Sequence, residues 1–145
     1  NRVEARYVNV IGEVVADLQR AVEAAVRYGV RWENVLVDPG IGFGKTPDQN
    51  LAVLEELAAL RVLARPIVLG TSRKSTLGRL LDLAPDQRVE ATIATTVLGV
   101  AAGVDVVRVH DVRPNRRAAS AADAIVRGWR PAGWASGPAT SASTR

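Results

Sequence analysis

The feature that most constrains the fold is a set of three short aliphatic runs, each separated from the next by a stretch with helical periodicity. The runs are Val35–Val37, Ile67–Leu69 and Val104–Val109. Short runs rich in β-branched residues are typical of strands buried on both faces. Strands that alternate with helices lie parallel and are joined by right-handed crossovers. The sequence therefore predicts an α/β fold with three parallel strands and flanking helices.

The stretches between the runs carry helix start and stop signals. Helices are predicted over about residues 10–28, 46–60, 75–81, 88–102 and 114–128. The second has the strongest start, because Thr46 can act as N-cap, Pro47 suits the first helical position and Gln49 completes a capping box. Its predicted buried stripe consists of Leu51, Leu54, Leu57, Ala58 and Leu60. Asp86 is the predicted cap of the fourth helix.

The length of the chain limits the architecture. Three parallel strands can form a small doubly wound sheet or part of a (β/α)8 barrel, and a complete barrel needs about 250 residues. With 145 residues, the chain would then be a fragment of a barrel. Residues 1–129 are predicted to form this α/β unit. Residues 130–145 are rich in Pro, Gly, Ser, Ala and Thr without a period, and we predict a disordered tail there.

Composition excludes several classes of function. The chain has no cysteine and a single histidine, so disulfides, thiolate metal sites and multi-histidine metal cages are excluded, and no protein metal site is predicted. The net charge of +4 is spread along the chain and does not indicate a nucleic-acid surface. No apolar run approaches the roughly 20 residues of a membrane span. A small anionic ligand is compatible with this composition.

Polar side chains follow each aliphatic run. Asp38 closes the first, Ser72 to Lys74 follow the second, and Arg108 and His110 end the third. Taken singly, Asp38 is more typical of a turn and Ser72 to Lys74 of a solvated helix start, while Arg108 with His110 is as often a surface pair as a site. Functional residues in parallel α/β folds gather at the carboxyl ends of strands, however, and side chains two apart on a strand share a face. Together the clusters predict a binding site that includes a basic pair for an anion.

The loop after the first run invites a nucleotide-hydrolase interpretation. It reads Asp38-Pro-Gly-Ile-Gly-Phe-Gly-Lys-Thr46, which ends like a phosphate-binding loop. That motif requires glycine five residues before its Gly-Lys pair, and Pro39 stands there instead. Proline removes a backbone donor that the phosphates would need. The sequence therefore argues against a nucleotide hydrolase.

Three runs resemble signatures of the dihydropteroate synthase family. They are Val37–Thr46 (VDPGIGFGKT), Gly70–Ser75 (GTSRKS) and Val107–Val112 (VRVHDV), in the order and spacing of that family. The similarity extends from Asn1 to about Trp129. It implies a (β/α)8 TIM-type barrel, of which this chain would be the C-terminal part with the last three strands and their helices.

The resemblance also implies an activity. Members of the family are transferases of folate biosynthesis that condense 6-hydroxymethyl-dihydropterin pyrophosphate with para-aminobenzoate, giving dihydropteroate and pyrophosphate. By resemblance, Asp38 would accept hydrogen bonds from the pterin, Lys74 would contact it from the other side, and Gly42 would allow close approach of the backbone. Arg108 and His110 would hold the pyrophosphate, so Asp38, Lys74, Arg108 and His110 are the candidate catalytic residues.

Further expectations follow from the same resemblance. Ser72 and Phe43 would line the para-aminobenzoate pocket, where sulfonamides would compete. Mg²⁺ would bind mainly through the pyrophosphate and through residues absent from this chain. The full-length protein is expected to be a cytoplasmic homodimer that acts on small molecules, with no nucleic-acid or membrane partner. The family's first half supplies further site residues, so the fragment alone is expected to be inactive.

Two alternatives stay open from the sequence. One is a pterin- or folate-dependent methyltransferase of the same barrel superfamily, which would have no pyrophosphate to hold. The other is a non-catalytic pterin-binding fragment. The basic pair formed by Arg108 and His110 favours the transferase over the methyltransferase, because it matches a diphosphate leaving group.

Overall fold

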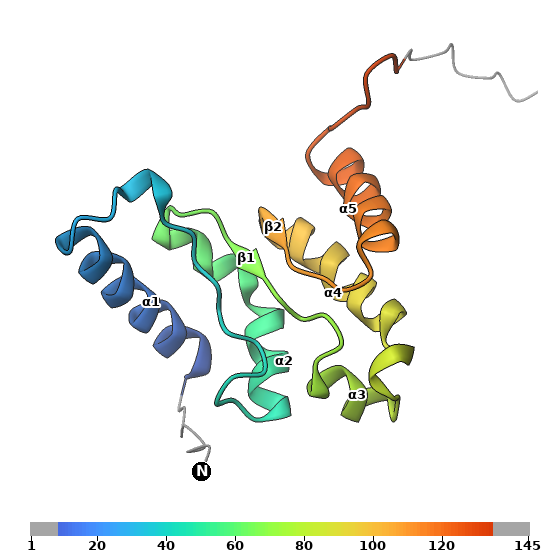
Figure 1. Cartoon of the computed structure of the whole chain (residues 1–145), viewed down its shortest axis with the longest axis horizontal. Helices are drawn as coiled ribbons and strands as arrows, with labels where there is room; N and C mark the ends of the chain where they lie inside the picture. The colour runs from blue at the N-terminus through green and yellow to red at the C-terminus, as the bar shows by residue number, and fades with distance from the viewer. Residues whose placement is uncertain (1–8, 135–145) are drawn as a thin grey trace, which may run out of the picture.

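The computed structural model describes residues 9–134 as an α/β arrangement in which a small parallel sheet lies between helices (Figure 1). In chain order the elements are α1 (Val10–Arg27), η1 (Trp32–Asn34), α2 (Pro47–Glu55), η2 (Leu57–Leu63), β1 (Val68–Leu69), α3 (Ser75–Leu81), η3 (Pro85–Gln87), α4 (Val89–Ala102), β2 (Val106–Val107) and α5 (Val112–Val126). Strands β1 and β2 pair in parallel, with Val68 opposite Val106 and Leu69 opposite Val107. The predicted α/β class with parallel strands is confirmed.

The three predicted strands are reduced to two strands and a single bridge. Of the first run, only Val37 pairs, through a parallel bridge to Ile67. Its N–H donates to the Pro66 carbonyl at 2.9 Å and its carbonyl accepts from Val68 at 2.7 Å. The start of the run follows directly on η1, and within residues 9–134 nothing pairs with its outer edge. Val35 and Leu36 lie outside the sheet that the described residues form.

Most predicted helices are observed within two residues of their expected ends. The exception is the second, where α2 stops at Glu55 and the chain continues as the 3₁₀ helix η2. Leu57, Leu60 and Leu63 are buried at a spacing of three, which suits the three residues per turn of a 3₁₀ helix. The predicted stripe was therefore wrong in part: Asn50 and Val53 are the buried positions of α2, whereas Leu51 and Leu54 are half-buried and Ala58 is exposed.

Of the two predicted helix caps, one is confirmed and the other is wrong. The box at Thr46 is confirmed, since its Oγ1 accepts from the Gln49 N–H at 3.2 Å while Gln49 Oε1 accepts from the Thr46 N–H at 2.8 Å. Asp86 is not the cap of α4, because it lies within η3 and α4 begins only at Val89. Helix α5 begins before Pro114, which therefore lies in the first turn, where its missing N–H leaves no bond unmade.

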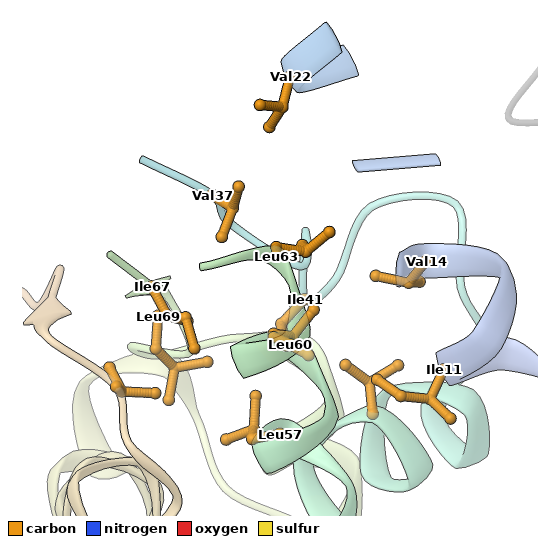
Figure 2. Close-up of a cluster of buried hydrophobic side chains, with 12 residues drawn as sticks. Ile11, Val14, Val22, Val37, Ile41, Leu57, Leu60, Leu63, Ile67 and Leu69 are labelled. Atoms are coloured by element: carbon orange, nitrogen blue, oxygen red, sulfur yellow. The ribbon is translucent and has the colours of Figure 1, made fainter. Parts of the chain in front are cut away.

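Buried aliphatic side chains join α1, η2 and the strands into one core (Figure 2). It contains Ile11, Val14, Val22, Val37, Ile41, Val53, Leu57, Leu60, Leu63, Ile67, Leu69 and Val104. Helices α4 and α5 pack against each other on the other side of the strands (Figure 1). The core therefore holds both ends of the Val37 bridge and β1 in place.

The C-terminal tail is described only in part. Beyond α5, residues 131–134 form a turn in which the Trp134 N–H donates to the Pro131 carbonyl at 3.1 Å. Residues 135–145 lie outside the described residues, so the disorder predicted for them stays a prediction. None of the helices between residues 9 and 134 is both long and apolar enough to cross a membrane.

The packing of η2 makes a direct prediction. Leu60 has 0% of its surface exposed, whereas Val62 in the same helix is 74% exposed. Leu60→Ala should lower the free energy of unfolding by about 2–5 kcal/mol, because it leaves a cavity in the core. The control Val62→Ala should change it by less than about 0.5 kcal/mol. Urea unfolding followed by circular dichroism measures both, and equal effects would contradict the core described above.

Candidate functional site

The chain leaves the Val37 bridge, β1 and β2 in the same direction, so the three polar clusters lie at one end of the sheet. Arg108 Nη2 lies 4.0 Å from Asp38 Oδ2, and Ser72 Oγ lies 2.9 Å from His110 Nδ1. Side chains from the second and third clusters line a hollow of about 600 Å³, here called the rim hollow. Its lining includes Gly70, Ser72, Arg73, Lys74, Arg108 and His110. The structure thus brings together the residues that the sequence singled out.

The loop after Val37 is shaped so that Asp38 faces this end. Asp38 Oδ1 accepts the Gly40 N–H at 2.8 Å, which leaves the second carboxylate oxygen toward Arg108. Lys45 Nζ donates to the Gly40 carbonyl at 3.1 Å and closes the loop. Burial lowers the pKa of Lys45, although the nearby Asp38 carboxylate acts in the opposite direction. The carboxylate is therefore held by its own loop and can still accept from a ligand.

Gly42 and Phe43 bring this loop against Lys74. The Gly42 N–H donates to Asn50 Oδ1 at 2.8 Å, and a Cβ at Gly42 would lie 3.0 Å from Lys74 Cδ. Gly42 also has a φ of +80°, a conformation that glycine adopts without strain. Lys74 Nζ then lies 4.1 Å from the centroid of the Phe43 ring, a cation–π contact. The ring itself remains 59% exposed at the surface.

Arg108 reaches across the end of β1 because Gly70 has no side chain. A Cβ at Gly70 would lie 2.5 Å from Arg108 Nη2, a distance at which the guanidinium would have to move. The Arg108 side chain is 64% exposed, and its Asp38 contact is long. Most of its donors therefore face solvent at the rim, where they can meet an anion.

Sequence reasoning missed an ion pair that ties two of the clusters together. Arg73 Nη2 donates to Asp111 Oδ1 at 2.8 Å, and Arg73 Nε donates to Asp111 Oδ2 at 3.2 Å. The hydrogen bond from Arg73 lowers the pKa of Asp111, and the same bond raises the pKa of Arg73. The signal that the sequence offered was that Arg73 and Asp111, which carry opposite charges, each lie next to a predicted site residue. The pair spans 38 positions, which local patterns do not reveal.

A second layer supports the turn that carries Arg73 and Lys74. Arg88 Nη1 donates to the Arg73 carbonyl at 2.9 Å, and the Arg73 N–H donates to Thr92 Oγ1 at 3.3 Å. Arg73 has a φ of +56°, so this turn holds a non-glycine residue in the left-handed region. Helix α4 thus anchors the turn from behind through its first residues.

Another hollow, of about 550 Å³, lies at the opposite end of the strands. Its lining includes Arg61, Arg65, Asp105 and Arg127. None of the predicted site residues lies there, and Asp105 uses Oδ2 to accept the Ile67 N–H at 2.9 Å. The rim hollow, at the carboxyl ends, is therefore the candidate site.

Metal ligands are scarce at this rim. Within residues 9–134 no group of three or more His, Cys, Asp or Glu side chains could hold a metal ion. The side chains that meet the rim hollow are mainly cations and donors, and these fit an anion and not Mg²⁺. The carboxylates nearby are engaged by Arg73 and by the Asp38 loop.

Comparison with known proteins places the chain in a family. A family model described as pterin binding enzyme matches residues 1–110. The dihydropteroate synthase of Clostridium beijerinckii is 47% identical over 128 residues, covering 88% of this chain and 48% of that protein. The dihydropteroate synthase of Bacillus subtilis is 45% identical over 126 residues, covering 87% and 44%. The chain belongs to the family of pterin-binding enzymes.

Solved structures give the same result. A dihydropteroate synthase from Clostridium difficile, determined in the presence of pteroic acid, superposes with a TM-score of 0.81 at 49% identity, over 85% of this chain and 47% of that one. The Thermus thermophilus enzyme in complex with 4-aminobenzoate gives a TM-score of 0.79 at 40% identity, over 86% and 50%. The chain spans about half the length of the relatives it matches.

The ion pair between Arg73 and Asp111 predicts a pH dependence of stability. Because the pKa of Asp111 is lowered in the folded chain, the ionised pair stabilises the fold above the unfolded pKa of about 3.9. That contribution is lost as the pH falls through the lower, folded pKa. Asp111→Asn should therefore lower the unfolding free energy at pH 7, and the difference from the unchanged chain should shrink below about pH 4.

Urea unfolding at several pH values measures this difference. Glu56→Gln is the matched control, because Glu56 is an exposed carboxylate outside the rim. A loss for Asp111→Asn that stays constant down to about pH 3, below the unfolded pKa, would show that the ion pair is not its source.

Proposed function

We propose that this chain is the C-terminal part of a (β/α)8-barrel dihydropteroate synthase, which condenses 6-hydroxymethyl-dihydropterin pyrophosphate with para-aminobenzoate. The observation that carries the proposal is the meeting of Asp38 with Arg108 at 4.0 Å, beside His110, at the carboxyl ends of the strands. Family membership and the relatives that bear this name support it. The barrel, with a third strand beside Ile67, is part of the proposal.

Asp38, Lys74 and Gly42 are the proposed pterin contacts. A carboxylate accepts two parallel donors, which matches the amino and ring N–H edge of a pterin. The Asp38 oxygen that faces Arg108 is placed for this, since the other is already bonded to the Gly40 N–H. Lys74 lies against Gly42 and Phe43, so it can close over the heterocycle from the opposite side.

Arg108 and His110 are the proposed pyrophosphate contacts. During the reaction the bond between the pterin methylene carbon and the pyrophosphate oxygen breaks, and its electron pair leaves with pyrophosphate. The amine nitrogen of para-aminobenzoate uses its lone pair to form the new carbon–nitrogen bond and then loses a proton to solvent. Donors aimed at the departing oxygens stabilise the charge that builds on them. Arg108 supplies such donors because it is mostly exposed at the rim.

Mg²⁺ would supply further charge neutralisation on the pyrophosphate. The residues of this rim do not offer a cation site of their own, so we propose that the ion is held by the substrate's oxygens and by residues outside this chain. The roles proposed for Arg108 and His110 do not depend on the ion.

Ser72 and Phe43 are the proposed neighbours of para-aminobenzoate. Phe43 presents an exposed ring beside Lys74, and Ser72 lines the rim hollow. The Thermus enzyme was solved with 4-aminobenzoate and a Yersinia pestis enzyme with a sulfonamide, which supports the same ligand class here. We further propose a cytoplasmic homodimer for the full-length protein.

A methyltransferase of the same superfamily is not favoured. The named relatives are dihydropteroate synthases, and a methyl transfer would leave the Arg108 and His110 pair without a diphosphate to bind.

Substitutions in the full-length protein separate the two halves of the proposed site. Arg108→Ala or His110→Ala should weaken binding of pterin pyrophosphate about 10- to 100-fold, because each removes charge-assisted hydrogen bonds. Binding of the pterin alcohol, which lacks phosphate, should change little. Asp38→Asn should weaken both ligands, since an amide donor would then face pterin donors. Isothermal titration measures all of these affinities.

Arg108 is exposed, so its substitution should leave the fold intact, and circular dichroism checks this. Equal losses for both ligands in Arg108→Ala would refute the pyrophosphate role.

The 145 residues alone are predicted to be inactive and poorly soluble or oligomeric. A barrel cut to its last strands leaves unpaired strand edges and uncovered apolar surface. Light scattering and a turnover assay on the purified chain test this. A monodisperse monomer with strong turnover would show that the missing half is not needed.

A further inference from the structure

The Ser72 hydroxyl makes two hydrogen bonds to the same residue, His110. It accepts the backbone N–H of His110 at 3.0 Å, and it lies 2.9 Å from the ring nitrogen Nδ1. Ser72, in the turn between β1 and α3, is only 5% exposed, whereas His110 is exposed and lines the rim hollow. One buried hydroxyl therefore fixes both the backbone and the ring of the histidine.

The protons of this contact can be assigned. The backbone N–H can only donate, so it occupies a lone pair of Ser72 Oγ. Between Oγ and Nδ1 either atom could donate. If Nδ1–H donated, the hydroxyl hydrogen of Ser72 would have no acceptor within residues 9–134, because both of its hydrogen bonds are to His110. A buried donor left unpaired is destabilising, because it loses its bond to water and gains none in return. The Ser72 O–H therefore donates, and Nδ1 accepts.

We propose that Ser72 is a positioning residue that holds neutral His110 as the Nε2–H tautomer, with this N–H presented to the rim hollow. The role of this N–H in binding pyrophosphate rests on the proposed function. The position of the proton on the ring rests on the contacts described above. Nε2 lies on the ring edge away from Nδ1, which is tied to Ser72. An anion there requires a donor, and the other tautomer would present a lone pair to it.

The surroundings hold both residues of the contact in place. Arg73 follows Ser72 directly and Asp111 follows His110 directly, and these two neighbours form the forked ion pair. The pair fixes the distance between the two loops. The ion pair thus keeps the backbones that carry Ser72 and His110 within reach of each other.

The test is made on the full-length protein labelled with ¹⁵N-histidine. The ring resonances that disappear in His110→Ala are those of His110, which assigns them. In the neutral ring, we expect Nε2 to carry the proton and Nδ1 to show the shift of an unprotonated, hydrogen-bonded nitrogen. A protonated Nδ1 would overturn the inference.

Two variants and a matched control make the result specific. Ser72→Ala should move the Nδ1 resonance to that of a ring exchanging between tautomers, whereas Ser72→Thr keeps a hydroxyl and should preserve the original spectrum. Thr71→Val removes a neighbouring buried hydroxyl that does not contact His110, and it should leave the ring resonances unchanged. Unchanged resonances in Ser72→Ala would also overturn the inference.

Kinetics in the full-length protein test whether the Nε2–H tautomer contributes to turnover. Ser72→Ala should lower kcat about 10-fold, the loss of roughly one hydrogen bond of about 1.4 kcal/mol. The same change should have little further effect on kcat in a His110→Ala background, because Ser72 acts on kcat through the ring, whereas a lost contact with para-aminobenzoate would appear in the KM of that substrate. Independent, additive losses would overturn the positioning role. The spectra need no substrate, so a failure of the proposed function would show as missing turnover with the predicted spectra intact.

Discussion

The parallel hydrogen bonds around Ile67–Leu69 determine where every site residue lies. The Val68 N–H donates to Val37 on one side, while Ile67 and Leu69 accept from Val106 and Arg108 on the other. A slip of one residue along either ladder would turn the side chains to the opposite face. The three segments also run in the same direction, so their following residues meet at one edge. Placement of the site is therefore a property of this short sheet and of the core beneath it.

Local features were readable from the sequence, and long-range ones were not. The start of α2 could be predicted because the capping box at Thr46 is complete within four residues. The end of α4 could be predicted because Gly103 adopts the left-handed conformation that favours glycine. The break between α2 and η2 was missed because apolar spacings of three and four overlap in a short window. The bond from Ser72 to His110 joins residues 38 positions apart, and no periodicity carries that information.

At this rim the acidic side chains have more protein partners than the basic ones. The carboxylates have fixed protein partners: Asp111 is bonded by Arg73, and Asp38 by its own loop. By contrast, among the described residues Arg108 makes only a long contact to Asp38, and the imidazole of His110 uses a single nitrogen toward them. The unmatched capacity at this edge is thus for donating hydrogen bonds and for positive charge. The substrate proposed above, a diphosphate ester of a flat heterocycle, would meet that capacity, and the proposed partner of its heterocycle is the Asp38 carboxylate.

Arg73 holds its ion pair from a left-handed backbone conformation, with a φ of +56°. A non-glycine residue there costs about 1–2 kcal/mol, which glycine would avoid. Glycine, however, would remove the guanidinium that joins the two loops. The backbone cost and the ion pair therefore act in opposite directions on the stability of the fold at this single position. The left-handed turn persists because the forked contact with Asp111 and the bonds with Arg88 and Thr92 hold it.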